Sequence, residues 1–224
     1  MRRLILSLLL FAAAPLQAAA PADADTLARI GAQIEQHAVV RAEFTQSKRM
    51  AALKRPLVTT GHLVFSRRHG VLWQIEQPYR ITYVLGEERI VEIAADGTRR
   101  ERGLRDVPGM AQVGRVFRAL LGANTAALGE TFTVVVRGDP DKWEIDLKPR
   151  QAQLAQFLSG LHLSGGRFVE SIRIDENGGA GETGQQGSKE NSKDSTQIRL
   201  RNAQSAEAPN ADELQLFGGV AGKP

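Results

Sequence analysis

The chain has 224 residues, no cysteine and a formal net charge of +4, of which Arg2 and Arg3 contribute half. The missing cysteine excludes disulfides, thiolate metal sites, a cysteine nucleophile and a lipid anchor on a lipoprotein-type cysteine. Nucleic-acid binding is not expected, because the charge is nearly balanced and aromatic residues make up only 5% of the chain.

The first twenty residues have the pattern of an export signal. A basic start precedes a short apolar run from Leu4 to Ala14, and Ala18 to Ala20 are small residues where a signal peptidase could cut. A bilayer-spanning helix needs about 20 apolar residues, so a retained anchor is the weaker alternative. We expect a signal peptide over 1–20, cleaved after Ala18 or Ala20, and a single exported domain over 21–224.

The mature chain begins with a helical pattern and then changes to strands. Apolar residues at helical spacing predict a short amphipathic helix over Thr26–His37. From Val40 onward apolar and polar residues alternate with a period of two, which is typical of half-buried strands. Asp96-Gly97 and Asp139-Pro140-Asp141 are turn signals between such strands. Ten segments show this alternation and predict an antiparallel meander: 40–45, 63–66, 71–75, 81–85, 89–95, 132–137, 143–147, 161–163, 172–174 and 196–201.

Two segments interrupt the strand pattern. Residues 107–120 place apolar side chains on one helical face and predict a second helix. Residues 176–194 are rich in glycine and charge and almost without large apolar groups, which predicts a flexible loop.

No pattern of catalytic residues is present. The four histidines lack metal-ligand spacing, and neither a nucleophile elbow nor a phosphate-binding loop occurs. We therefore expect no enzyme activity, no cofactor and no metal. Two basic clusters remain as possible contacts for anionic head groups or a protein partner. They are Arg67-Arg68-His69 and a group formed by Arg99, Arg100, Arg102 and Arg105.

Four spaced motifs occur in a fixed order, three of them in the first half of the chain. Phe44-Thr45-Gln46 gives F-x-Q in a predicted strand. Gly61, Leu63 and Arg67 form G-x-L-x-x-x-R, and Trp73 with Gln77-Pro78 forms W-x-x-x-Q-P. A further L-x-P occurs at Leu147-Lys148-Pro149. In these motifs and their order, the chain resembles the LolA family of periplasmic lipoprotein carriers.

The resemblance implies an α+β fold: an incomplete antiparallel half-barrel whose concave apolar face is covered by a helical lid. It implies that Arg67 binds backbone carbonyls of the lid and latches it, a role that suits the five donors of a guanidinium. The apolar face of the helix predicted over 107–120 is expected to lie over the barrel mouth, as part of this lid. The side chains expected to line a lipid cavity are Phe44, Leu63, Phe65, Val71, Trp73, Ile75, Tyr83, Met110, Val113 and Phe117.

The implied function is that of a monomeric periplasmic carrier. It would take acyl chains of lipoproteins from an inner-membrane exporter to an outer-membrane acceptor. The family's proline after the latch arginine is replaced by Arg68, and an expected Asp-Gly turn is replaced by Leu85-Gly86. These departures indicate a divergent branch that could carry another lipid or glycolipid. Asp212–Phe217 resembles the family's final strand, although the Pro-x-Gly that commonly follows it is absent.

Two other functions stay open. The same half-barrel could serve as a periplasmic sensing module that binds a lipidated or misfolded ligand. A hydrolase would require a constellation of catalytic residues that the sequence does not display.

Overall fold

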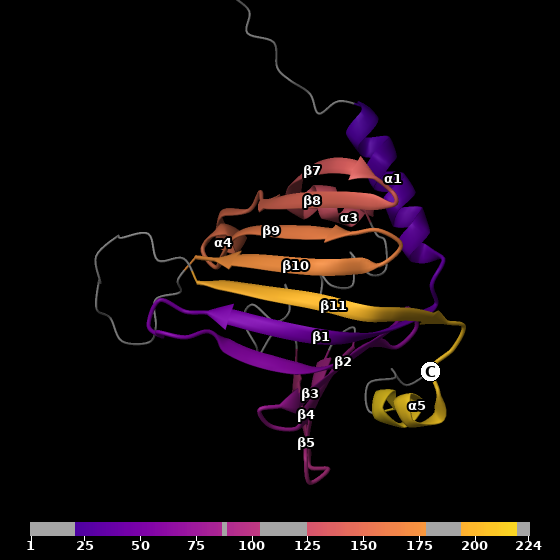
Figure 1. Ribbon diagram of the computed structural model, residues 1–224, viewed down its shortest axis with the longest axis vertical. Coiled ribbons are helices and arrows are strands. Elements are labelled where there is room, and N and C mark those ends of the chain that lie inside the picture. Colours follow the sequence, from indigo (N-terminus) through magenta and orange to yellow (C-terminus); the bar gives the residue numbers. More distant parts are fainter. Residues whose placement is uncertain (1–20, 87–88, 104–124, 178–193, 219–224) are drawn as a thin grey trace, which may run out of the picture.

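One antiparallel sheet organises this protein in the computed structural model, which describes residues 21–86, 89–103, 125–177 and 194–218 (Figure 1). The eleven described strands follow the order β6-β5-β4-β3-β2-β1-β11-β10-β9-β8-β7. Among these described strands, only the β1–β11 contact joins strands distant in sequence. The strands are β1 (Val39–Arg49), β2 (Leu57–Ser66), β3 (Gly70–Gln77), β4 (Ile81–Leu85), β5 (Arg89–Ala94), β6 (Arg99–Gly103), β7 (Phe132–Asp139), β8 (Lys142–Pro149), β9 (Leu158–Gly165), β10 (Val169–Glu176) and β11 (Ser195–Ala206).

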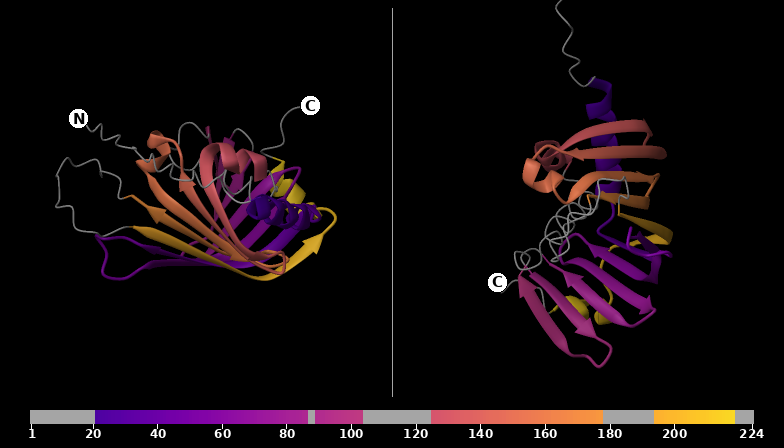
Figure 2. Two further views of the ribbon diagram at one scale, coloured as in Figure 1. Left: turned by 90° about the horizontal axis from the view of Figure 1, so that it is seen from above. Right: turned by 90° about the vertical axis from the view of Figure 1, so that its left-hand side faces the viewer.

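The sheet is curled but not closed, because β6 and β7 form its two free edges (Figure 2). Four described helices accompany it: α1 (Pro21–Glu35), α3 (Thr125–Thr131), α4 (Ala152–Ala155) and α5 (Ala211–Phe217). The expected α+β fold with an open, incomplete antiparallel barrel is therefore confirmed. The helix predicted over 107–120 lies outside the described residues, as do the segment 1–20 and most of the predicted loop over 176–194.

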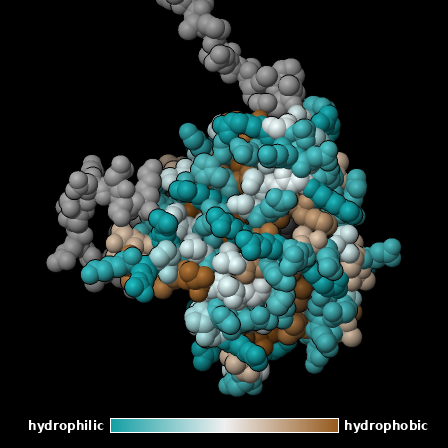
Figure 3. Space-filling model, viewed as in Figure 1, coloured by the Kyte–Doolittle hydropathy of each residue, from teal (hydrophilic) through white to brown (hydrophobic). Residues whose placement is uncertain are grey.

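Alternation along each strand gives the sheet two chemically different faces. On β8, Trp143, Ile145 and Leu147 are buried in the larger core cluster, whereas Glu144 and Lys148 are exposed. The concave face contributes such apolar residues from β1 to β4 and from β7 to β11, and α1, α3 and α4 pack against it. The opposite, convex face is largely hydrophilic over β8 to β11 (Figure 3).

Strand β6 is the one described strand that alternation did not reveal. Its sequence, Arg99 to Gly103, has no large apolar side chain, and it pairs only with β5 at the edge of the sheet. Charged side chains on an edge strand oppose pairing with other chains, which explains why this segment lacks the usual strand signal.

The first helix begins earlier than predicted, at Pro21 and not at Thr26, and it ends at Glu35. Proline suits the first turn of a helix because its fixed φ is already helical and it has no N–H to leave unpaired. Ile30 and Ile34, both buried, fix the inner face of α1 against the concave core. None of the helices in the described part of the chain is long and apolar enough to cross a membrane.

The expectation of a final strand over Asp212–Phe217 is wrong, because this segment forms helix α5. Asn210 caps the helix by accepting a hydrogen bond from the Glu213 N–H, and the Glu213 carboxylate accepts one from the Asn210 N–H. This reciprocal capping box is a strong local signal for a helix start. Phe217 then anchors α5 on the convex face, in a second core cluster with Val39, Val64, Leu72, Val84 and Val91.

Candidate functional site

The concave face brings together the predicted cavity residues that lie in strands. Phe44, Leu63, Phe65, Val71, Trp73 and Ile75 are all buried in the same cluster, and Tyr83 packs against it half-buried. The rings of Phe44 and Trp73 stack with centroids 3.9 Å apart and planes 25° apart. Met110, Val113 and Phe117 lie outside the described residues.

Gly61, the glycine of the G-x-L motif, allows β2 and β3 to approach closely. A Cβ atom at this position would lie 1.8 Å from the backbone carbonyl oxygen of Gln74, so any side chain would force the strands apart. The register between the two strands shifts between Thr60 and Gly61. The motif glycine therefore shapes the part of the sheet that carries Leu63 and Trp73.

Charged and polar groups continue the concave face toward its β6 edge. Tyr83 lies opposite Glu92, and Ile90 lies opposite Arg102, so these side chains share one face of the sheet. Burial, with the negative charge of Glu92, raises the pKa of the Tyr83 hydroxyl, and the charge of Arg102 acts against this rise. The phenol is therefore a neutral hydrogen-bonding group between the apolar part of the concave face and the charged groups toward β6.

Strand alternation divides the second basic cluster between the two faces. Arg100 and Arg102 lie on the concave side, whereas Arg99 lies on the convex side and donates a 3.4 Å hydrogen bond to the Gln215 carbonyl of α5. Arg105 lies outside the described residues. The cluster therefore does not form one continuous basic patch among the described residues.

Arg67 lies in the turn between β2 and β3, next to the end of α1. Its Nη2 atom donates a long hydrogen bond of 3.5 Å to the His37 carbonyl oxygen, and its backbone N–H donates to the Ala38 carbonyl oxygen at 3.0 Å. Arg68 beside it is exposed, and the His69 ring stacks on Phe217 with centroids 5.4 Å apart. The structure therefore places Arg67 at the junction of α1 and β1.

The same junction contains a buried histidine that the sequence did not single out. His37 is 7% exposed, its ring lies 4.8 Å from the Phe168 ring, and its Nε2 atom is buried without a hydrogen-bond partner among the described residues. Burial, followed by the nearby charges of Arg167 and Arg67, lowers the pKa of His37 below its ordinary value of 6.5. This imidazole is therefore held in its neutral form.

A small cavity of about 20 Å³ lies beside His37. Its lining comes from the end of α1, from β1, β2 and β11, and from the Arg167–Val169 segment before and at the start of β10. This volume holds about one water molecule and is far too small for an acyl chain. A chain could enter this part of the concave face only if its covering elements moved.

A larger, open hollow of about 550 Å³ marks a split between β10 and β11. The two strands pair from Asp175–Ser195 to Ser171–Arg199. After Arg199, β11 continues and pairs, among the described strands, with β1 alone. Asn202, with a φ of 53°, lies where the β1–β11 register shifts. This hollow and the small cavity share Phe168, Val169, Leu200 and Ala203 as lining residues.

Gln33, a residue that the sequence analysis passed over, holds α1 to the sheet. The Gln33 amide donates to the Pro140 and Gly166 carbonyl oxygens, both at 2.9 Å, and the Trp143 indole also donates to the Gly166 oxygen at 2.8 Å. The β7–β8 turn and the β9–β10 turn are therefore tied to α1, the helix that covers the concave face. Gln33 is polar on an otherwise apolar helical face, and its role depends on contacts more than 100 residues away in sequence.

Solved structures that are similar to this chain have low sequence identity to it. A DUF1329 family protein from Desulfovibrio piger is 11% identical with a TM-score of 0.45, over 89% of this chain and 98% of that chain. A LolA superfamily protein from Nitrosomonas europaea is 7% identical with a TM-score of 0.44, over 86% and 96%. The MucA/MucB complex of Pseudomonas aeruginosa contains a chain that is 13% identical with a TM-score of 0.46, over 87% and 60%. No curated protein matches the chain.

A family model gives the assignment that these distant likenesses do not. The model, described as outer membrane lipoprotein carrier protein LolA-like, matches residues 18–206. This range includes every described strand from β1 to β11 and therefore the whole concave face. The protein belongs to this LolA-like family.

Proposed function

We propose that this protein is a periplasmic carrier that holds acyl chains of lipoproteins, or of a related (glyco)lipid, on its concave face. The observation that carries the proposal is the continuous apolar surface from β1 to β4 and from β7 to β11. Membership of a family described by lipoprotein carriage supports the choice of cargo. The export pattern of residues 1–20 supports the compartment. The proposal includes no catalytic role.

The chemistry of lipids explains why such a surface is needed. Each buried methylene contributes about 0.8 kcal/mol, so two or three acyl chains leave a membrane very slowly by themselves. A carrier must replace the bilayer with an apolar protein surface during the passage through water. The concave face supplies this surface, and in our proposal it receives cargo from an inner-membrane exporter and passes it to an outer-membrane acceptor.

Loading beside α1 requires the cover of this part of the concave face to move, because the cavity there is too small for a chain. We propose that Arg67 acts as a latch, as the family resemblance implies. The contact with the His37 carbonyl supports this role, since it ties the β2–β3 turn to the end of α1. Cargo that binds the open form more tightly than the closed form would shift the equilibrium toward the open form.

The first test is to identify lipids that copurify with the native protein. Protein isolated from its own periplasm without detergent is extracted, and the extract is analysed by mass spectrometry. We expect acylated species at a constant ratio to protein. An extract with no acylated species above that of a similarly purified periplasmic protein would contradict carriage and would favour the sensing function.

A charge on the concave face should reduce cargo retention. Val71→Glu places a carboxylate at a buried apolar position, where charge is costly, and copurified lipid should fall several-fold. Gln74→Glu is the matched control, because it introduces the same group on the same strand but on the convex face. Both variants need a native circular dichroism spectrum. Equal lipid content in both would contradict the site.

Loss of the latch should affect release more than binding. In Arg67→Leu the guanidinium that contacts the His37 carbonyl is removed, so the closed form loses stability relative to the loaded form. We expect cargo to be accepted but transferred poorly to outer-membrane vesicles. Arg68→Leu, which changes the exposed neighbour, is the control. Transfer by Arg67→Leu at the wild-type rate would remove the latch from the proposal.

A further inference from the structure

Exposed apolar side chains gather at one end of the sheet. Among the described residues, seven large apolar side chains are exposed, and five of them lie at this end. The exceptions are Val135 on β7 and Leu214 on α5. The five are Leu53, Leu57, Val58, Tyr79 and Phe157, with exposed fractions from 43% to 56%.

Strand pairing brings these five residues together although they come from three separate turns. Leu53, Leu57 and Val58 belong to the β1–β2 hairpin, whose tip projects from the sheet (Figure 2). Tyr79 follows the end of β3, where Gln77 pairs with Thr60 beside that hairpin. On the other side, the Ala51 N–H donates to Asp194 at the start of β11. The Phe157 carbonyl accepts a hydrogen bond from the Asn177 N–H beyond β10.

Cations are interleaved with these apolar groups. Arg49, Lys54, Arg55 and Arg80 are all exposed, and none of the four forms an ion pair with another described residue. Lys48 is different, because it pairs with Glu176 at 3.0 Å. We call this end of the sheet the docking edge. It consists of Leu53, Leu57, Val58, Tyr79 and Phe157 together with Arg49, Lys54, Arg55 and Arg80.

We propose that the docking edge binds the surface of a bilayer that contains anionic phospholipids. Apolar side chains flanked by cations fit the boundary between head groups and acyl chains, and a tyrosine ring is favoured at the same depth. Each Lys or Arg near an anionic surface contributes attraction that falls off within a Debye length. The surplus of unpaired cations at this edge therefore selects an anionic membrane.

Docking in this way would connect the membrane with the concave face. Ile75 at the end of β3, Ile81 at the start of β4 and Ile174 near the end of β10 are concave residues close to the docking edge. A bilayer bound there would lie beside the apolar surface on which we place the cargo. The inference thus rests on the proposed function for its purpose, but the binding itself can be measured without cargo.

The test is flotation of the mature chain, residues 21–224, with vesicles of phosphatidylcholine alone or mixed with phosphatidylglycerol. We expect binding to the anionic vesicles, weakened by salt. The double variant Lys54→Glu/Arg55→Glu should bind at least about tenfold more weakly, because two attractions become repulsions. Leu53→Ser/Leu57→Ser should also reduce binding, and this reduction should persist at low salt.

The matched control is Arg199→Glu/Arg201→Glu, which makes the same change in net charge at exposed positions outside the docking edge. If this control loses as much binding as Lys54→Glu/Arg55→Glu, attraction is general and the proposal is wrong. No binding of the wild type to anionic vesicles also overturns it, and would leave a protein as the partner of this edge.

Cargo measurements separate this inference from the proposed function. Once loaded, docking-edge variants should retain lipid as the wild type does, because the concave face is unchanged, whereas Val71→Glu should lose lipid but still bind vesicles. Vesicle binding in a protein that never carries lipid would contradict carriage alone. Lipid carriage without vesicle binding would contradict docking alone.

Discussion

The two faces of the curled sheet use the same alternating strands for opposite purposes. The concave face is a continuous apolar surface in which indole and aliphatic side chains from nine strands meet. The convex face over β7 to β10 carries charged side chains that pair across neighbouring strands. Each strand from β7 to β10 thus contributes to a core on one side and to a hydrated surface on the other.

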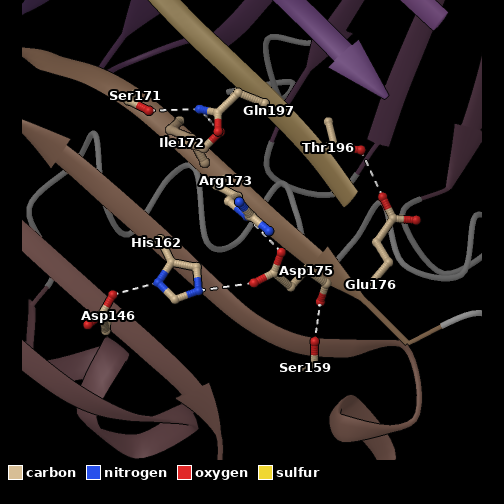
Figure 4. A network of polar contacts seen from close by, with 10 residues as sticks. All are labelled: Asp146, Ser159, His162, Ser171, Ile172, Arg173, Asp175, Glu176, Thr196 and Gln197. Atoms are coloured by element: carbon tan, nitrogen blue, oxygen red, sulfur yellow. Dashed lines mark hydrogen bonds and ion pairs between the residues drawn. The ribbon is translucent and has the colours of Figure 1, made fainter. Parts of the chain in front are cut away.

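Convex pairs form a chain of contacts across four strands, β7 to β10, and Figure 4 draws the part of it on β8 to β10. The two ring nitrogens of His162 on β9 lie 2.6 Å from Asp146 on β8 and 3.1 Å from Asp175 on β10. Arg173 donates to Asp175 at 2.8 Å, and Arg137 donates to Asp146 at 2.6 Å. Exposed pairs of this kind contribute little stability, so this face mainly keeps the sheet soluble and in register.

The comparison of the two faces shows which face stabilises the fold and on which face substitutions should change lipid binding. Apolar burial on the concave face stabilises the fold, and in our proposal the same surface binds lipid. A substitution there affects both properties, whereas a convex substitution should affect neither. The exception is the part of the convex face under α5, where Phe217 forms a separate apolar contact.

Two adjacent valines on β7 provide the strongest test of this difference. Val136 is 7% exposed on the concave face, and Val135 is 40% exposed on the convex face. Val136→Ala should lower the free energy of unfolding by about 2 kcal/mol, because it removes buried methyl groups and leaves a cavity. Val135→Ala should change it by about 0.5 kcal/mol or less. Urea unfolding checks both, and equal losses would mean that the two faces are not energetically distinct.

The second prediction concerns α5 and its ion pair with β1. Arg41 donates to both carboxylate oxygens of Glu213 at 2.6 Å. Burial acts to raise the pKa of Glu213, but the hydrogen bonds from Arg41 and Asn210 and the charge of Arg41 outweigh it, so the pKa lies below its ordinary value of 4.5. Glu213→Gln keeps a side chain that suits the capping box and removes only the charge. It should cost about 1 kcal/mol at neutral pH.

The sign of the pH dependence follows from that lowered pKa. The folded protein binds this proton less readily than the unfolded chain, so the stabilisation is present above about pH 4.5 and is lost as the pH falls through the folded-state pKa. The wild type and Glu213→Gln should therefore converge in stability in acid. A constant difference from neutral to acidic pH would show that packing, and not charge, holds α5 on the convex face.

Most of the sheet could be predicted from the sequence because alternation is a local signal. It revealed ten of the eleven described strands and placed Val71, Trp73 and Ile75 on one face. Strand β6 escaped because an edge strand needs no apolar face. Helix α5 was missed because the expectation followed the resemblance to the family's final strand. The local signal for a helix was present, since Asn210 and Glu213 have the spacing of a capping box.

The geometry around Arg67 depends on contacts that no local pattern contains. The motif identified the arginine, but its partner is the carbonyl of His37, 30 residues earlier in the chain. Nothing in the sequence distinguished His37 from the other three histidines. Its burial follows from the packing of its ring against Phe168, which lies in the turn between β9 and β10.

The smallest expected effect concerns this histidine and extends the comparison to the end of α1. Because burial and the charges of Arg167 and Arg67 lower its pKa, the unfolded chain takes up this proton more readily than the folded protein. Wild-type stability should be full above about pH 6.5 and should fall below it. His37→Phe retains a ring beside Phe168 and removes the unpartnered Nε2, so its stability at neutral pH should equal or exceed that of the wild type.

Urea unfolding of both proteins between about pH 8 and pH 5 measures the effect, the range being chosen around the ordinary pKa of histidine. We expect the free energy of unfolding of His37→Phe to rise relative to that of the wild type as the pH falls, because only the wild type has to exclude a proton from this buried site. Parallel curves would mean that His37 is not held neutral. In that case water would reach the junction that Arg67 contacts. The part of the concave face that excludes water would then end before α1.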